Sequence, residues 1–221
     1  MKSMSIISIL WNAPLSIKFV VCFLLTCSIM SWAIIIAKFI KLKKMNTASN
    51  EFENDFWSSK SLDSLFNSVK TNPYDPMSSM FCVAMIELKD IIERRTLDTK
   101  IVEKRMDRAT SVIFRKIMGE LESGMGFLSA IGTNGVIIGI FGTVLGIMGG
   151  FRAIAGSNSS SISIIAPVVS EALITTAIGL IVAIPAAIAY NILSARINSY
   201  AVRMENFQDE LSVIMARYIH A

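Results

Sequence analysis

The chain has 221 residues, of which 53% are hydrophobic and 17% are charged, with a formal net charge of +4. This apolar share is too high for an ordinary soluble domain, so part of the chain is expected to lie in lipid. The basic residues are dispersed and interleaved with acids, which argues against a nucleic-acid-binding surface.

The first predicted element is a transmembrane helix at residues 19–37, after a short N-terminal segment at 1–18. The run is uncharged and is followed by a cluster of four lysines, Lys38, Lys41, Lys43 and Lys44. It is longer than the apolar core of a signal peptide, and no small-residue cleavage site precedes the lysines. The segment is therefore expected to remain in the mature protein as a membrane span.

A charged helical region is predicted next, at 38–125. Apolar residues recur there at intervals of three and four, which is the helical period. A first break is expected at 72–76, where Asp75 can cap a helix that opens at Pro76. A second break is expected at 96–98. The helix that follows it is expected to run on into the second span.

Two further spans are predicted, at 126–154 and at 163–193. The first of these includes an extension at its cytoplasmic end. Residues 123–151 carry no charge over 29 positions, and as a helix they would measure about 43 Å, more than the hydrocarbon thickness. The small polar residues at 156–161 predict a turn outside the bilayer, within a loop at 155–162.

A C-terminal helix is predicted at 194–221, and the basic residues determine the expected orientation. Residues 38–122 hold 15 of the 21 basic residues, and positively charged flanks stay in the cytoplasm. The predicted fold is thus an all-α polytopic membrane protein with three transmembrane helices, its N-terminus outside and its C-terminus in the cytoplasm.

The sequence contains no pattern typical of an enzyme or of a cofactor site. A Walker loop, an HExxH pair, a CxxC pair, a Gly-x-Ser-x-Gly elbow and a dinucleotide fingerprint are all absent. The three cysteines, Cys22, Cys27 and Cys82, are expected to be small buried apolar residues rather than metal ligands. We therefore expect no enzyme, no cofactor and no metal site.

Glu171 is the only acidic residue within any predicted span. It lies about nine residues, or roughly 13 Å, beyond Ile162, a depth that a short side chain cannot escape by snorkelling. An ionisable group at this depth is costly to keep charged, which makes it a candidate for proton exchange. The alternative is a carboxyl that only hydrogen-bonds a neighbour and orders the helices.

Hydroxyl and small residues surround this candidate. Thr143, Thr175 and Thr176 are expected to line a wet proton pathway together with Glu171. Pro185 removes one backbone hydrogen bond and suggests a hinge. Other positions carry glycine at spacings suited to close helix packing: Gly139, Gly142, Gly146 and Gly179. Three helices enclose no pore, so a ring of copies with a guest helix is the expected assembly.

Two sequence runs resemble a known family. Residues 138–148, IGIFGTVLGIM, and residues 165–191, IAPVVSEALITTAIGLIVAIPAAIAYN, are similar to the second and third spans of the TolQ/ExbB/MotA proton-channel family. Shorter stretches at 31–32, 52–58 and 206–211 are closer to the TolQ members than to the ExbB members. The similarity covers nearly the whole chain.

The resemblance implies a homopentamer in the bacterial inner membrane, with the N-terminus in the periplasm. Its second and third spans would line a pore that holds the single-span helices of a TolR-like dimer, whose aspartate carries the proton. By motif position, Thr143, Glu171 and Thr176 surround that aspartate, whereas Thr175 stands where the family more often has a small apolar residue. Proton flow would rotate the ring against the dimer and transmit force through a TolA-like protein during constriction.

Two residues depart from the family pattern, and two other functions stay open. Leu145 replaces the usual tryptophan, and Val168 replaces the usual glycine after Ala-Pro. The resemblance therefore does not determine the geometry of the pore mouth. The implied function is a proton-channel stator subunit of the Tol-Pal envelope motor, serving outer-membrane integrity and cell division. The alternatives are an ExbB-type subunit that energises TonB-dependent uptake and a non-conducting membrane scaffold.

Overall fold

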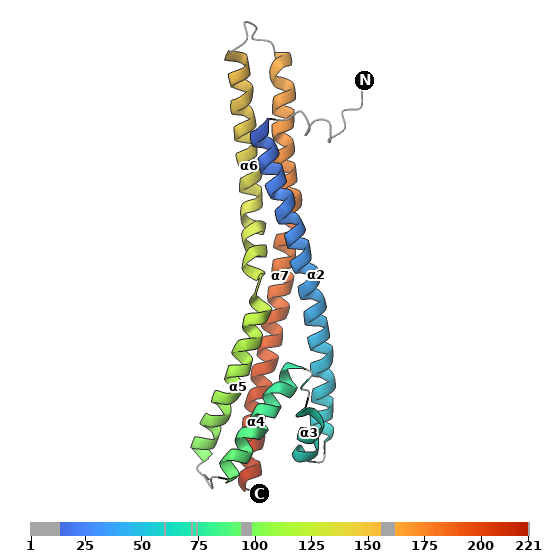
Figure 1. Cartoon of the computed structure of the whole chain (residues 1–221), viewed down its shortest axis with the longest axis vertical. Coiled ribbons are helices and arrows are strands. Elements are labelled where there is room, and N and C mark those ends of the chain that lie inside the picture. Colours follow the sequence, from blue (N-terminus) through green and yellow to red (C-terminus); the bar gives the residue numbers. More distant parts are fainter. Residues whose placement is uncertain are drawn as a thin grey trace. The chain divides into compact units, whose positions relative to one another are not determined.

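A computed structural model describes residues 14–59, 61–71, 73, 75–93, 99–155 and 162–220. Within these residues every regular element is an α-helix (Figure 1): α2 (Leu15–Ser58), α3 (Leu62–Val69), α4 (Pro76–Glu93), α5 (Thr99–Glu122), α6 (Met125–Ala155) and α7 (Ile162–His220). Three stretches are long and apolar enough to cross a membrane: Leu15–Ser58, Ile101–Arg152, which contains parts of α5 and α6 and the two turn residues between them, and Ala166–Tyr218. The prediction of an all-α chain with three membrane-spanning helices is confirmed.

The chain divides into two compact units. The apolar unit comprises Met1–Ala37 and Gly124–Ile192, and the charged unit comprises Lys38–Ser123 and Leu193–Ala221. Helices α2 and α7 each contribute to both units without a break in the helix. The predicted C-terminal helix at 194–221 is therefore the continuation of α7, because no glycine or proline follows Pro185 in this helix.

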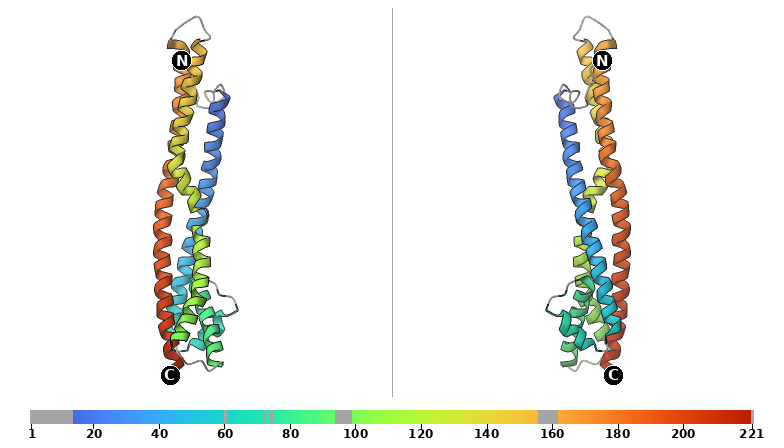
Figure 2. Two further views of the ribbon diagram at one scale, coloured as in Figure 1. Left: turned by 90° about the vertical axis from the view of Figure 1, so that its left-hand side faces the viewer. Right: turned by 90° about the vertical axis from the view of Figure 1, so that its right-hand side faces the viewer.

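In the apolar unit, α6 and α7 run antiparallel and lie side by side in all views (Figures 1 and 2). The first part of α2 belongs to the same unit. Its Ile17 and Val21 are buried and pack against Ile178 of α7. Side chains on the opposite face of α6, such as Ile137 and Phe141, are exposed, which is the expected state of a surface that faces lipid or another protein chain.

The prediction that one helix runs without a break from the charged region into the second span is wrong. Helix α5 ends at Glu122, and α6 begins at Met125. Between them Gly124 has a φ of 79°, a left-handed conformation that glycine adopts without steric cost and that ends a helix. A Cβ atom at Gly124 would also lie 3.4 Å from the Ile34 side chain.

The predicted start of the helix at Pro76 is confirmed. Pro76 is the first residue of α4. The Asp75 carboxylate accepts hydrogen bonds from the backbone N–H groups of Met77 and Ser78, at 3.0 and 2.9 Å, as an N-cap side chain should. The second predicted break, at 96–98, and the polar turn at 156–161 lie outside the described residues.

Four aromatic residues from three helices form the core of the charged unit. Phe52 and Phe56 of α2 contact Phe81 of α4 and Phe207 of α7, with ring centroids 5.4 to 6.0 Å apart. This spacing and the tilted orientations are those of favourable aromatic pairs. The cluster ties together helices that are more than 100 residues apart in the sequence.

A buried polar network lies beside this core. Ser49 Oγ donates a hydrogen bond to the Asp75 carboxylate at 3.0 Å and lies 2.7 Å from the Tyr200 hydroxyl. Burial raises the pKa of Tyr200 to about 12, and the hydrogen bond with Ser49 opposes this change. Arg203 adds a half-buried ion pair to Glu53, with an N–O distance of 2.7 Å.

Replacing Phe52 by alanine is expected to lower the unfolding free energy of the charged unit by about 3–5 kcal/mol, since the side chain is fully buried in the aromatic cluster. Amide hydrogen exchange in α2 and α4, read by mass spectrometry, measures the loss. Trp57→Ala is the control, because Trp57 is exposed and touches the cluster only through the ring of Phe56, so its loss of protection should be much smaller. Equal loss of protection in the two variants would show that the cluster does not stabilise the unit.

Candidate functional site

The candidate site lies along the contact between α6 and α7, where small residues let the two backbones approach closely. A Cβ atom on Gly132 would lie 2.9 Å from the Cα atom of Ala187, and one on Gly146 would lie 2.5 Å from the Cβ atom of Ala172. The glycines that face α7 recur at three- and four-residue intervals, the spacing of one helix face: Gly132, Gly135, Gly139, Gly142 and Gly146. A methyl group on any of them would push the helices apart.

The two helices also approach closely at Gly179 of α7. A Cβ atom there would lie 2.7 Å from the carbonyl oxygen of Gly135 and 3.0 Å from the Cα atom of Gly139. Helix pairs in membranes gain stability mainly from such close packing, since lipid offers no hydrophobic drive for association. The glycines thus place the backbone of α6 against the hydroxyl groups of α7.

Three predicted site residues meet at this contact, around the carbonyl oxygen of Gly139. Thr175 and Thr176 both donate a hydrogen bond to that oxygen, each at 3.2 Å. The Oγ1 atom of Thr143 lies 3.5 Å from that of Thr176. The structure therefore brings Thr143, Thr175 and Thr176 together, although Thr143 comes from a different helix.

The three threonines differ in their environment. Thr175 is fully buried, and its hydroxyl also lies 2.6 Å from the carbonyl oxygen of Ala172. Thr143 donates to the carbonyl of Ile140 and, like Thr176, is partly exposed. Thr175 is thus suited to hold the helices together, whereas the oxygen atoms of Thr143 and Thr176 can meet water or a partner chain.

Glu171 lies one helical turn before Thr175, which places the two side chains on neighbouring positions of one face. Glu171 is partly exposed. Among the described residues, no hydrogen bond or ion pair involves its carboxylate. Ile178, two turns further along the same face, packs against α2. Glu171 is therefore adjacent to the threonine group, and its carboxylate is available to another group.

The remaining sequence predictions concern residues around this contact. Helix α7 runs on through Pro185, and the role of Pro185 as a hinge stays a prediction. Val168 of α7 faces α6, since a Cβ atom on Gly150 would be 3.4 Å from the Cγ1 atom of Val168. Leu145 is partly buried. The Gly139 carbonyl was not foreseen, because a backbone acceptor leaves no signal in a sequence.

Comparison with known proteins assigns the chain to a family. Residues 79–206 match the MotA/TolQ/ExbB proton channel family. This chain belongs to that family. The matched range contains all of α5 and α6 and most of the spanning part of α7, and so includes every residue of the candidate site.

Relatives from two branches of the family match over most of the chain. The Tol-Pal system protein TolQ of Pseudomonas aeruginosa is 34% identical over 96% of this chain and 93% of its own length. The TolQ protein of Haemophilus influenzae is 33% identical over 93% of this chain and 91% of its own length. The biopolymer transport protein ExbB of Salmonella typhimurium is 27% identical, over 93% of this chain and 84% of its own length.

Proposed function

We propose that the chain is the proton-channel stator subunit of a Tol-Pal envelope motor, which uses the proton motive force to maintain the outer membrane and to support constriction at division. Its family and its greater identity to the TolQ relatives than to the ExbB relative support this. The chain is a multi-pass membrane protein of the bacterial inner membrane.

The grouping of Thr143, Thr175 and Thr176 beside Glu171, inside spanning helices, is the observation that carries the proposal. Glu171 exchanges a proton with the aspartate of the partner helix, which carries the proton. The hydroxyls of Thr143 and Thr176 orient water or the partner's acid, and Thr175 holds α7 against the Gly139 carbonyl. In this scheme the chain is not an enzyme, needs no cofactor and couples to protons alone.

The proposed assembly is a homopentamer around a TolR-like single-span dimer, and it acts through a TolA-like protein. One chain encloses no pore, and a single carboxyl cannot carry a proton across about 30 Å of hydrocarbon. The exposed apolar face of α6 is suited to contact neighbouring copies or lipid. The proposed orientation places the N-terminus in the periplasm and the charged unit in the cytoplasm, in line with its basic residues.

Thr176→Val tests the role of the hydroxyl. Valine has nearly the same shape, so α7 is expected to pack normally, while motor activity falls by about tenfold or more because a positioned hydrogen-bonding group is lost. The measurement is leakage of a periplasmic enzyme from cells whose only copy of the chain is the variant. Thr176→Ser keeps the hydroxyl and should stay close to wild type.

The same cells separate the two motor functions. Loss of the chain should cause leakage through the outer membrane while TonB-dependent uptake of iron chelates continues. Loss of uptake with an intact outer membrane would instead identify an ExbB-type subunit. Wild-type integrity in Thr176→Val cells would show that this hydroxyl takes no part in the pathway.

A further inference from the structure

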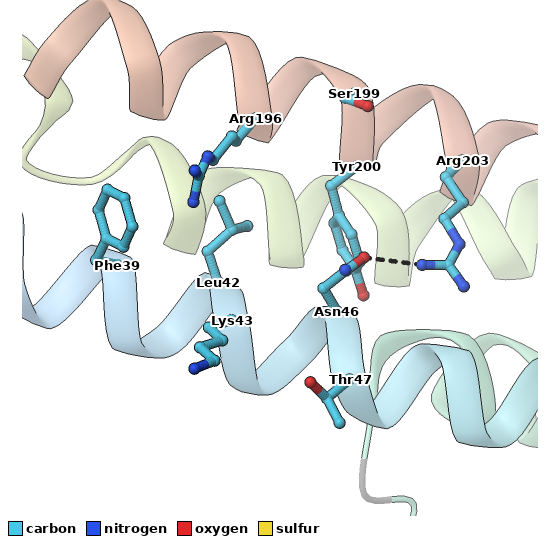
Figure 3. Close-up of a pocket in the computed structure, with 9 residues that line it drawn as sticks. All are labelled: Phe39, Leu42, Lys43, Asn46, Thr47, Arg196, Ser199, Tyr200 and Arg203. Atoms are coloured by element: carbon cyan, nitrogen blue, oxygen red, sulfur yellow. Dashed lines mark hydrogen bonds between the residues drawn. The ribbon is translucent and has the colours of Figure 1, made fainter.

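A pocket of about 490 Å³ opens between α2 and α7 within the charged unit (Figure 3). Phe39, Leu42 and Lys43 line it from α2, and Arg196 and Tyr200 line it from α7. Phe39, Leu42 and Arg196 lie at one end of the pocket, and Tyr200 lies toward the other end with Asn46 and Arg203 (Figure 3). None of these residues belongs to the proton pathway.

The lining contains three cations and no acid, and only one of the cations is neutralised. Arg203 is paired with Glu53 at 2.7 Å and donates to Asn46 Oδ1 at 2.8 Å. Lys43 has no acidic partner among the described residues. Arg196 lies over the ring of Phe39 at 4.5 Å, which orients its guanidinium without neutralising it. Two positive charges therefore remain available to an anion.

The position of the pocket along its helices corresponds to the headgroup layer of the membrane. Lys43 is six residues beyond Ala37, the end of the uncharged run, which is about 9 Å of helix. Arg196 is three residues beyond Leu193, or about 5 Å. The polar layer of a bilayer is roughly 5–8 Å thick on each side of the hydrocarbon. The two free cations thus lie at or near the depth of lipid phosphates.

We propose that this pocket binds the phosphodiester headgroup of an anionic phospholipid from the cytoplasmic leaflet of the membrane. The Arg196 guanidinium presents paired N–H donors to two phosphate oxygens, and Lys43, whose side chain leaves the other side of α2 (Figure 3), adds positive charge nearby. Phe39 and Leu42 contact the first methylene groups of the acyl chains. Basic pockets beside spanning helices recognise anionic lipids in this way. The inference uses the proposed membrane placement of the helices and is independent of proton conduction.

Native mass spectrometry of the full chain, purified in detergent and titrated with dioleoyl-phosphatidylglycerol or dioleoyl-phosphatidylcholine, tests the site. The wild-type chain is expected to bind the anionic lipid more tightly than the zwitterionic one. Lys43→Gln and Arg196→Gln should each weaken binding of the anionic lipid by about fivefold. Lys44→Gln removes the same charge one residue further on, outside the lining, and should leave the preference unchanged.

Three results would overturn the proposal. Equal losses in Lys43→Gln and Lys44→Gln would indicate a diffuse attraction to surface charge. Displacement of the lipid by millimolar inorganic phosphate would indicate a site for free anions. A cross-link from Lys43 to an acidic residue of a second copy would indicate a contact between subunits. Unchanged thermal unfolding of each variant excludes misfolding, and the lipid measurement needs no motor activity, so the two proposals fail separately.

Discussion

Glu171→Gln is expected to reduce proton flow through the assembled protein by about a hundredfold or more, because glutamine can accept and donate hydrogen bonds but cannot take up and release a proton. The two side chains are nearly equal in size. Among the described residues the carboxylate makes no hydrogen bond or ion pair that folding would lose. Flow is measured with a pH-sensitive dye inside vesicles that contain the chain and its single-span partner.

Two further variants test whether the effect depends on an ionisable group at position 171. Glu171→Asp keeps the ionisable group on a shorter side chain and should retain part of the flow. Ser170→Ala changes the exposed neighbouring residue and should conduct like wild type. If Glu171→Gln conducts normally and its cells keep an intact outer membrane, the carboxyl has no part in conduction, and the scaffold alternative becomes the better account.

Gly146→Ala is expected to destabilise the apolar unit by about 1–3 kcal/mol, the usual cost of an extra methyl group in a filled contact. The new Cβ atom would lie 2.5 Å from that of Ala172 and 3.2 Å from the Cδ1 atom of Ile17, so α6 would have to move away from α7, while the tip of the Ile17 side chain would have to shift slightly. Thermal unfolding of the purified protein in one fixed detergent measures the change.

Gly149→Ala is the matched control for this substitution. Gly149 lies in the same helix, and a Cβ atom there would meet no atom within 4 Å. Alanine is favoured over glycine inside a helix by about 0.5–1 kcal/mol, so this variant should be as stable as wild type or slightly more stable. A fall of equal size in both variants would contradict the close packing of α6 and α7.

In the proposed mechanism, helix packing and proton flow are linked through the contact between α6 and α7. Gly142 lies against Thr175, since a Cβ atom on this glycine would be 2.7 Å from the Oγ1 atom of the threonine. The same small residues that stabilise the helix pair therefore keep the threonine hydroxyls within reach of the Gly139 carbonyl. Separating the helices at Gly146 is also expected to displace the threonine hydroxyls near Thr176. Proton flow would then fall although no ionisable residue is removed.

The amino-acid sequence alone was sufficient to identify the membrane-spanning helices and the start of one helix in the charged unit. Long uncharged runs identify spans because backbone polar groups and charges cannot be satisfied in hydrocarbon outside a helix. Asp75 and Pro76 predict a helix start because capping and a fixed φ act within a few residues. Glu171 was also recognisable as a candidate, since a lone carboxyl within a span is rare, and the threonines followed from their position near it and from the family motif.

The way in which residues far apart in the chain meet could be learned only from the folded protein. The pairing of Gly146 with Ala172, and the meeting of Thr143 with Thr176 at the Gly139 carbonyl, depend on the register of two antiparallel helices. The break at Gly124 depends on a single backbone angle, which its neighbours in sequence do not determine. Local rules act over one or two helical turns, whereas register follows from the fit of whole helix faces.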